Sequence, residues 1–93
     1  MASSHDPHRP YGGRRRDKAN FEITLSSKTF KSDEGIIPKF IPDLPDTRKE
    51  MANYCTSVRR LDDMMGTILD ELKKSGHYDN TIVIFMSDHG MSL

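Results

Sequence analysis

The sequence has 93 residues, of which 34% are hydrophobic and none is tryptophan. A chain of this length forms at most one small domain, and its low apolar content leaves little surface for a core. Fourteen basic residues balance fourteen acidic ones, so net charge gives no general attraction to nucleic acid or anionic membranes. Since no 18-residue apolar run is present, we expect no transmembrane helix. From the balanced charge, we expect neither a membrane nor nucleic acid as a partner.

Residues 1–11 have no charged start followed by an apolar core, so we expect no signal peptide, and the compartment stays open. They contain the dense run His5-Asp6-Pro7-His8-Arg9, followed by a second proline. The two prolines exclude a helix and favour an extended or turning path. A stiff backbone beside His8 favours a fixed imidazole, which can donate a proton or hold an anion. The alternatives are a surface turn with ordinary histidines and, for Arg9, a plain surface arginine.

Residues 12–35 are polar and aperiodic, which is typical of a surface excursion. Only residues 21–25 alternate like a short strand. The basic run at 14–16 is compatible with a solvated loop or with an anion contact. Residues 36–46 contain three prolines with apolar residues between them, so we expect an extended strap laid over a larger body.

A long amphipathic helix is predicted over residues 47–75. Thr47 and Glu50 form a T-x-x-E capping box, and Gly76 is the expected residue after the C-terminal end. Apolar residues recur at alternating steps of 3 and 4, the pattern of one buried helix face. These residues are Met51, Tyr54, Val58, Leu61, Met65, Ile68 and Leu72.

Residues 81–86 are a continuous β-branched and aromatic run that does not alternate. The pattern predicts a strand buried on both faces, as in a parallel sheet covered by helices. Helix, turn and buried strand make one step of an α/β fold. The chain offers at most one weak further strand, so its sheet needs partners and we expect a piece of a larger α/β domain.

A loop at 87–93 follows the strand and contains Asp88 and His89. In open α/β sheets, ligands bind beyond the carboxyl ends of the strands. A carboxylate with an imidazole suits Ca²⁺, Mg²⁺ or Zn²⁺. The alternative is an aspartate that caps the next element beside an incidental histidine. Two ligands are too few for a closed site, so others would come from elsewhere.

Three segments together resemble the sulfatase family of the alkaline-phosphatase-like superfamily, especially the N-sulfoglucosamine and iduronate types. Residues 5–11 are similar to the family's D-P-H-R or K-P-H-x-P-[YF] segment. Residues 79–90 are close to its D-N-T-[IL]-V-[IV]-F-x-S-D-H-G motif. Between them, the proline strap runs into a helix that carries Tyr54, Arg60, Leu61, Asp62 and Gly66.

The resemblance implies a partial alkaline-phosphatase-like α/β sandwich domain over residues 1–93, with 1–11 as the active-site histidine segment. It implies that Asp88 and His89 bind the catalytic divalent cation, usually Ca²⁺ in sulfatases. It implies that His8 is catalytic and binds the sulfate or its bridging atom, with Arg9 and His5 as weaker candidates.

Other parts of the family's catalytic unit cannot be placed. They include an upstream aspartate pair and the formylglycine nucleophile, which arises from a C-x-P-S-R motif. Cys55 is the one cysteine, but the motif's proline is absent and the residue falls inside the predicted helix, so we expect it to be structural. Removing members of a catalytic unit is severe.

We therefore expect part of an enzyme that hydrolyses a sulfate ester or sulfamate, with a sulfated small molecule or glycan as substrate. The isolated chain is expected to be inactive and to need the remainder of the sulfatase domain. One alternative is a phosphodiesterase or phosphatase of the same superfamily. Another is a non-catalytic interaction module.

Overall fold

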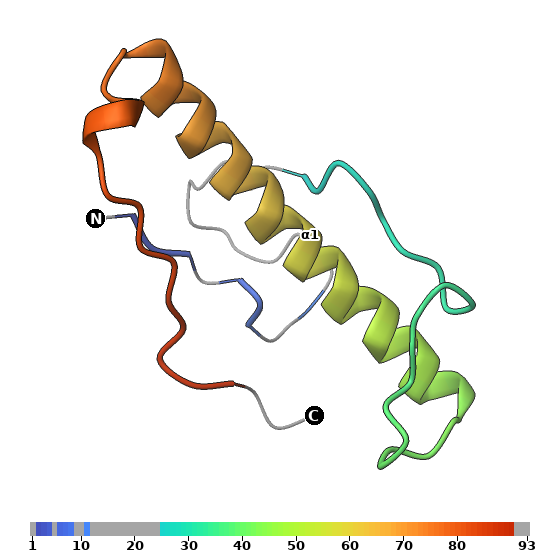
Figure 1. Ribbon diagram of the computed structural model, residues 1–93. Helices are drawn as coiled ribbons and strands as arrows, with labels where there is room; N and C mark the ends of the chain where they lie inside the picture. The colour runs from blue at the N-terminus through green and yellow to red at the C-terminus, as the bar shows by residue number, and fades with distance from the viewer. Residues whose placement is uncertain (1, 5, 9–10, 12–24, 91–93) are drawn as a thin grey trace, which may run out of the picture.

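The computed structural model describes residues 2–4, 6–8, 11 and 25–90. One long helix dominates this part of the chain: α1, Pro45–Lys74, which has 30 residues (Figure 1). At about 1.5 Å per residue, α1 is about 45 Å long. A short 3-10 helix, η1, follows at Tyr78–Asn80. None of the helices in the described ranges is long and apolar enough to cross a membrane.

The N-terminal end of α1 differs from the predicted capping box. The helix begins at Pro45, with Leu44 as the N-cap residue in extended conformation, and no side chain caps it. Proline suits the first helical position because its φ angle is preset and its missing N–H would have had no helical partner. Thr47 therefore lies inside the first turn, and the prediction that it caps the helix was wrong.

The C-terminal end of α1 follows the prediction. The backbone N–H of Ser75 donates to the carbonyl of Glu71 at 2.9 Å, and that of Gly76 donates to the carbonyl of Lys73 at 3.0 Å. Gly76 has a φ angle of +74°, in the left-handed region that glycine enters without a steric penalty.

Residues 25–35 run antiparallel to α1 along its N-terminal two thirds. Ser27 donates from its backbone N–H and from its hydroxyl to the Asp63 carboxylate, both at 2.7 Å. The Phe30 N–H donates to the Thr56 hydroxyl at 3.0 Å. The predicted surface excursion is thus tied to the helix in its described part, while residues 12–24, with most of the weak strand at 21–25, lie outside the described residues.

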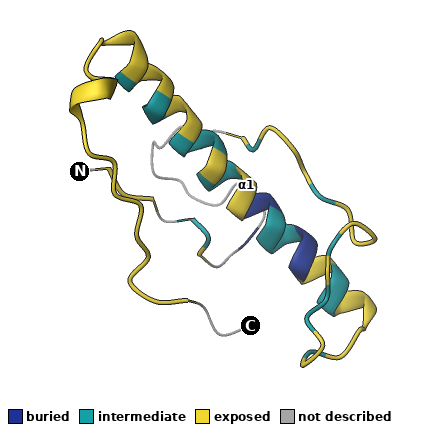
Figure 2. Cartoon of the chain, in the orientation of Figure 1, coloured by how far each residue is buried: buried dark blue, intermediate teal, exposed yellow. Residues whose placement is uncertain are grey.

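The small core lies where two flanking segments meet α1 (Figure 2). The buried residues of the described ranges are Tyr11, Met51, Ala52, Thr56 and Ser57. Within the predicted apolar stripe only Met51 is buried, and Val58 is 38% exposed. No residue between 58 and 74 is buried, although Leu61, Met65, Ile68 and Leu72 of the stripe are half-buried. The expected core packing of this helix face is therefore only partly seen in this chain. The described segments therefore cover the C-terminal half of α1 only in part.

The proline strap at 36–46 is less extended than expected. The backbone N–H of Ile41 donates to the carbonyl of Pro38 at 3.0 Å, which closes a turn. Ile36 is 86% exposed and Phe40 is 78% exposed. The strap therefore exposes Ile36 and Phe40, whereas Ile37 and Ile41 are half-buried. Its packing onto a larger body stays a prediction.

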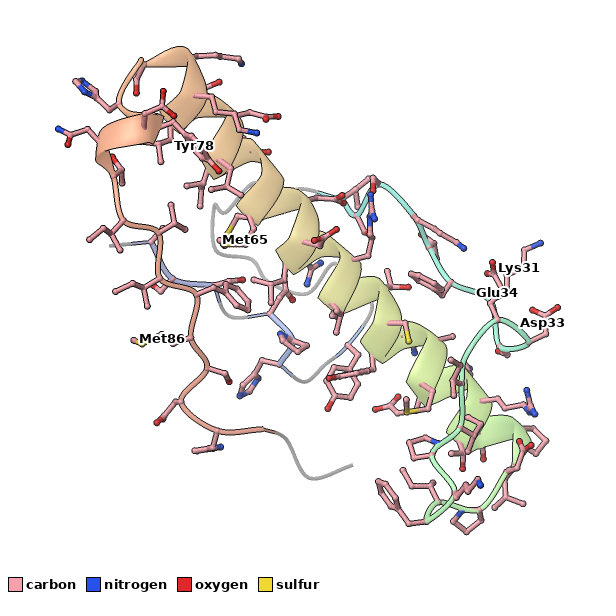
Figure 3. The ribbon with its side chains drawn as sticks, viewed as in Figure 1. Lys31, Asp33, Glu34, Met65, Tyr78 and Met86 are labelled. Atoms are coloured by element: carbon pink, nitrogen blue, oxygen red, sulfur yellow. The ribbon has the colours of Figure 1, made fainter. Side chains whose placement is uncertain are left out.

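The segment at 81–86 is neither a strand nor buried in this structure. No strand occurs among the described residues. Ile82, Ile84 and Met86 are 89%, 73% and 80% exposed, and Figure 3 shows Met86 directed away from α1. No strand among the described residues pairs with this segment, so a sheet does not satisfy its backbone groups there. The expected buried strand is therefore unconfirmed.

Candidate functional site

The segment that carries His8 is fixed to α1 by an ion pair. The Arg60 Nε donates to one Asp6 carboxylate oxygen at 2.6 Å, and its Nη2 donates to the other at 2.5 Å. The two side chains are only 15% and 18% exposed, Asp6 being the more buried. Such bidentate arginine–carboxylate contacts combine strength with a defined geometry. The hydrogen bonds to Asp6 raise the pKa of Arg60, so this guanidinium stays charged.

A second contact anchors the same segment. Tyr11 is 4% exposed, and its ring meets the ring of Tyr54 edge to face, with centroids 5.3 Å apart and an interplanar angle of 79°. Aromatic pairs favour this arrangement because the positive ring edge faces the negative ring face. Asp6 contacts α1 at Arg60, and Tyr11 contacts it at Tyr54. The two contacts therefore follow the chain in the direction opposite to that of α1.

His8 lies between the two anchors in the chain and is exposed. His5 and Arg9 lie outside the described residues. The substrate contact expected for Arg9 therefore stays a prediction.

The predicted metal ligands are neighbours at the end of the exposed segment. The His89 Nε2 lies 3.9 Å from an Asp88 carboxylate oxygen, with the side chains 84% and 99% exposed respectively. The His89 Nδ1 lies 3.0 Å from the carbonyl oxygen of Gly90. In the tautomer whose Nδ1–H donates to that carbonyl, the Nε2 atom carries the lone pair of the ring. This lone pair could bind a cation.

The pair fits a divalent cation as part of a ligand set. Calcium–oxygen distances of about 2.3–2.6 Å allow two donors 3.9 Å apart to share one ion. Calcium takes about 6–8 ligands, and within the described residues no group of three or more ligating side chains occurs. Asp88 and His89 could therefore supply only two donors, and the remainder of the shell would have to come from other residues or water.

Cys55 is half-buried within α1. A helical position agrees with the structural role expected for it. The functional feature that sequence reasoning missed is the pairing of Asp6 with Arg60. These residues are 54 positions apart in the chain, and no local pattern connects them.

Comparisons with known proteins agree with the motifs. The profile of the Sulfatase family matches residues 1–93. N-sulphoglucosamine sulphohydrolase from Homo sapiens is 39% identical over 56 residues, which cover 60% of this chain and 11% of that protein. The multifunctional alkaline phosphatase superfamily protein PehA from Trinickia caryophylli is 37% identical over 51 residues, covering 55% of the chain and 10% of PehA.

A third relative is the uncharacterized sulfatase YdeN from Escherichia coli (strain K12). It is 53% identical over 38 residues, which cover 41% of this chain and 7% of YdeN. The chain thus aligns with between 7% and 11% of the length of these three relatives. No solved structure matches the chain with significance.

Proposed function

Because the chain belongs to the sulfatase family, we propose that it is part of a hydrolase that cleaves a sulfate ester or a sulfamate. The observation that carries this proposal is the family match over residues 1–93. Membership implies an alkaline-phosphatase-like α/β fold and sulfated substrates such as glycans. The name of the human relative, N-sulphoglucosamine sulphohydrolase, supports a sulfated sugar as the substrate class.

His8 is the proposed catalytic residue of this chain. Charge develops on the bridging atom as the bond to sulfur breaks, and an imidazolium can stabilise that charge or protonate the leaving group. His8 suits this role because it is exposed on a segment held to α1 through Asp6 and Tyr11. Arg9 is proposed as a weaker contact to the anionic substrate.

Asp88 and His89 are the proposed cation ligands, with Ca²⁺ as the expected ion. The bound cation would supply positive charge next to the sulfate oxygens. The two side chains hold their donor atoms close enough to share an ion. Their exposure leaves room for further ligands from outside the described residues.

The remainder of the sulfatase domain is the proposed partner of this chain. Residues 81–86 would then form the expected parallel strand, because neighbouring strands satisfy the backbone and bury Ile82, Ile84 and Met86. Their present exposure supports this view, since apolar runs of this kind are unfavourable in water. The formylglycine nucleophile of the family would come from another segment, because Cys55 is half-buried in α1. The 93-residue chain alone is therefore expected to release no sulfate.

The proposal is tested by the release of sulfate or phosphate from matched aryl esters and of sulfate from sulfated sugars. The natural protein that contains this chain should release sulfate, should lose activity when Ca²⁺ is chelated, and should recover when Ca²⁺ returns. Asp88→Asn should abolish turnover, whereas Asp33→Asn, an exposed loop carboxylate (Figure 3), should not. Phosphate release without sulfate release would replace the proposal with the phosphatase alternative. No turnover of any ester would favour a non-catalytic module.

A further inference from the structure

We propose that Asp6 and Arg60 form a positioning pair that sets where the His8 imidazole lies. The inference rests on the proposed function for the role of His8. The pair itself is defined by geometry, through two hydrogen bonds of 2.6 and 2.5 Å between a carboxylate and a guanidinium. Neither residue is proposed to touch the substrate.

The pair is suited to holding rather than to reacting. Both carboxylate oxygens of Asp6 accept hydrogen bonds from Arg60. The opposite charges compensate each other, so little net charge is left to act on a substrate. At 15% and 18% exposure, water competes weakly for these hydrogen bonds, and the contact keeps most of its strength.

The position of Asp6 is transmitted to His8 over a short and stiff connection. Pro7 is the only residue between them, and its ring restricts the backbone φ angle. Arg60 lies in the middle of α1, which is a rigid base. Together with the Tyr11–Tyr54 contact on the other side of His8, the pair leaves the histidine backbone few alternative paths.

The chain contains a matched control for this pair. Arg48 makes the same two-point contact with Asp43, with Nε and Nη2 each 2.6 Å from a carboxylate oxygen. That pair is 38% and 53% exposed, and it joins residues five positions apart at the start of α1. Arg48→Gln therefore removes a similar ion pair without touching the segment that carries His8.

The first test measures the order of His8 directly and does not depend on activity. In the 93-residue chain, the backbone order parameter of His8 is expected near 0.85, and Asp6→Asn or Arg60→Gln should lower it below about 0.6. Arg48→Gln should leave it unchanged, and the exchanged pair Asp6→Arg with Arg60→Asp should restore it in part. A His8 that is already mobile in the wild type, or that stays ordered in both variants, would overturn the positioning pair.

The second test uses sulfate release by the natural protein that contains this chain. Asp6→Asn and Arg60→Gln should each lower kcat by roughly 100-fold, with a smaller change in KM, because a misplaced catalytic group costs about this factor. The exchanged pair should recover part of kcat, and Arg48→Gln should match the wild type.

The two tests separate the inference from the proposed function. A wild type that releases no sulfate, or a His8→Ala variant with full activity, contradicts the proposed function, while the order parameter still decides whether the pair positions His8. Full activity in Asp6→Asn, in a protein that requires His8, contradicts the inference alone.

Discussion

Replacing Thr56 with valine tests how residues 25–35 are attached to α1. The Thr56 hydroxyl accepts a hydrogen bond from the Phe30 N–H at 3.0 Å and donates to the Ala52 carbonyl at 2.9 Å. Thr56 is 6% exposed, so water cannot readily replace it. Valine has nearly the same shape but no hydroxyl, and Thr56→Val therefore leaves the Phe30 N–H without its acceptor.

The expected cost is that of an unsatisfied polar group in a partly buried place, about 1–3 kcal/mol. Since about 1.4 kcal/mol corresponds to a factor of ten, amide hydrogen exchange at Phe30 should be roughly 5- to 150-fold faster in Thr56→Val. The Ala52 carbonyl contributes little to this cost, because it lies inside α1 and keeps its helical hydrogen bond.

Thr67→Val is the matched control. The Thr67 hydroxyl donates to the Asp63 carbonyl at 3.0 Å, but at an exposed position. Its loss should change stability by less than about 0.5 kcal/mol and leave exchange at Phe30 unaltered. Equal exchange at Phe30 in the wild type and in Thr56→Val would refute the reasoning, as would an equal effect of the two substitutions.

Three further predictions concern α1 and the segments beside it. Hydrogen bonds from the Ser27 backbone and hydroxyl hold the pKa of Asp63 below its ordinary value of 3.8. The stability from this carboxylate is therefore present above pH 3.8 and lost as pH falls through the lowered pKa. The Ser27 amide chemical shift should report the loss, and in Asp63→Asn this pH dependence should disappear. Gly76→Ala should destabilise the chain by about 1–2 kcal/mol because of its left-handed backbone, whereas Gly66→Ala, in the open interior of α1, should stabilise it by about 0.5–1 kcal/mol. Thermal unfolding followed by circular dichroism measures both, and equal signs would contradict the account. Ile84→Lys should reduce self-association in size-exclusion chromatography without loss of helix, because an exposed apolar segment favours intermolecular pairing; unchanged association would argue against such pairing.

The helix was predictable because its signal is local and long. Apolar steps of 3 and 4 over seven positions identify α1, and Gly76 identifies its end. The start was misplaced by two residues because Thr47 and Glu50 satisfy the capping-box pattern, while Pro45 is equally suited to the first helical turn. Two compatible start signals so close together cannot be ranked from sequence alone.

The core and the anchors of the site could not be predicted in the same way. The buried positions Thr56 and Ser57 are small and polar, and they lie off the apolar stripe. Their burial depends on which distant segments pack there, as does the contact between Asp6 and Arg60. Residues 81–86 show the converse case: their composition predicts a buried strand, but burial requires neighbours that the described residues do not supply.

The candidate site residues were chosen from sequence motifs, and their roles stay predictions. Asp88 and His89 are close enough to share a cation, and His8 is exposed on an anchored segment. The structure adds the contacts on either side of His8, Asp6 with Arg60 and Tyr11 with Tyr54, which join residues far apart in the chain.

The most direct test of the account is sulfate release by the natural protein that contains this chain, with His8→Ala and Asp88→Asn singly and combined. If His8 and the cation act as one catalytic unit, each single variant should lose at least about 100-fold in kcat. The double variant should then lose little more than the worse single one, because members of such a unit are strongly non-additive. Full activity in either single variant, or losses that multiply in the double variant, would contradict the account.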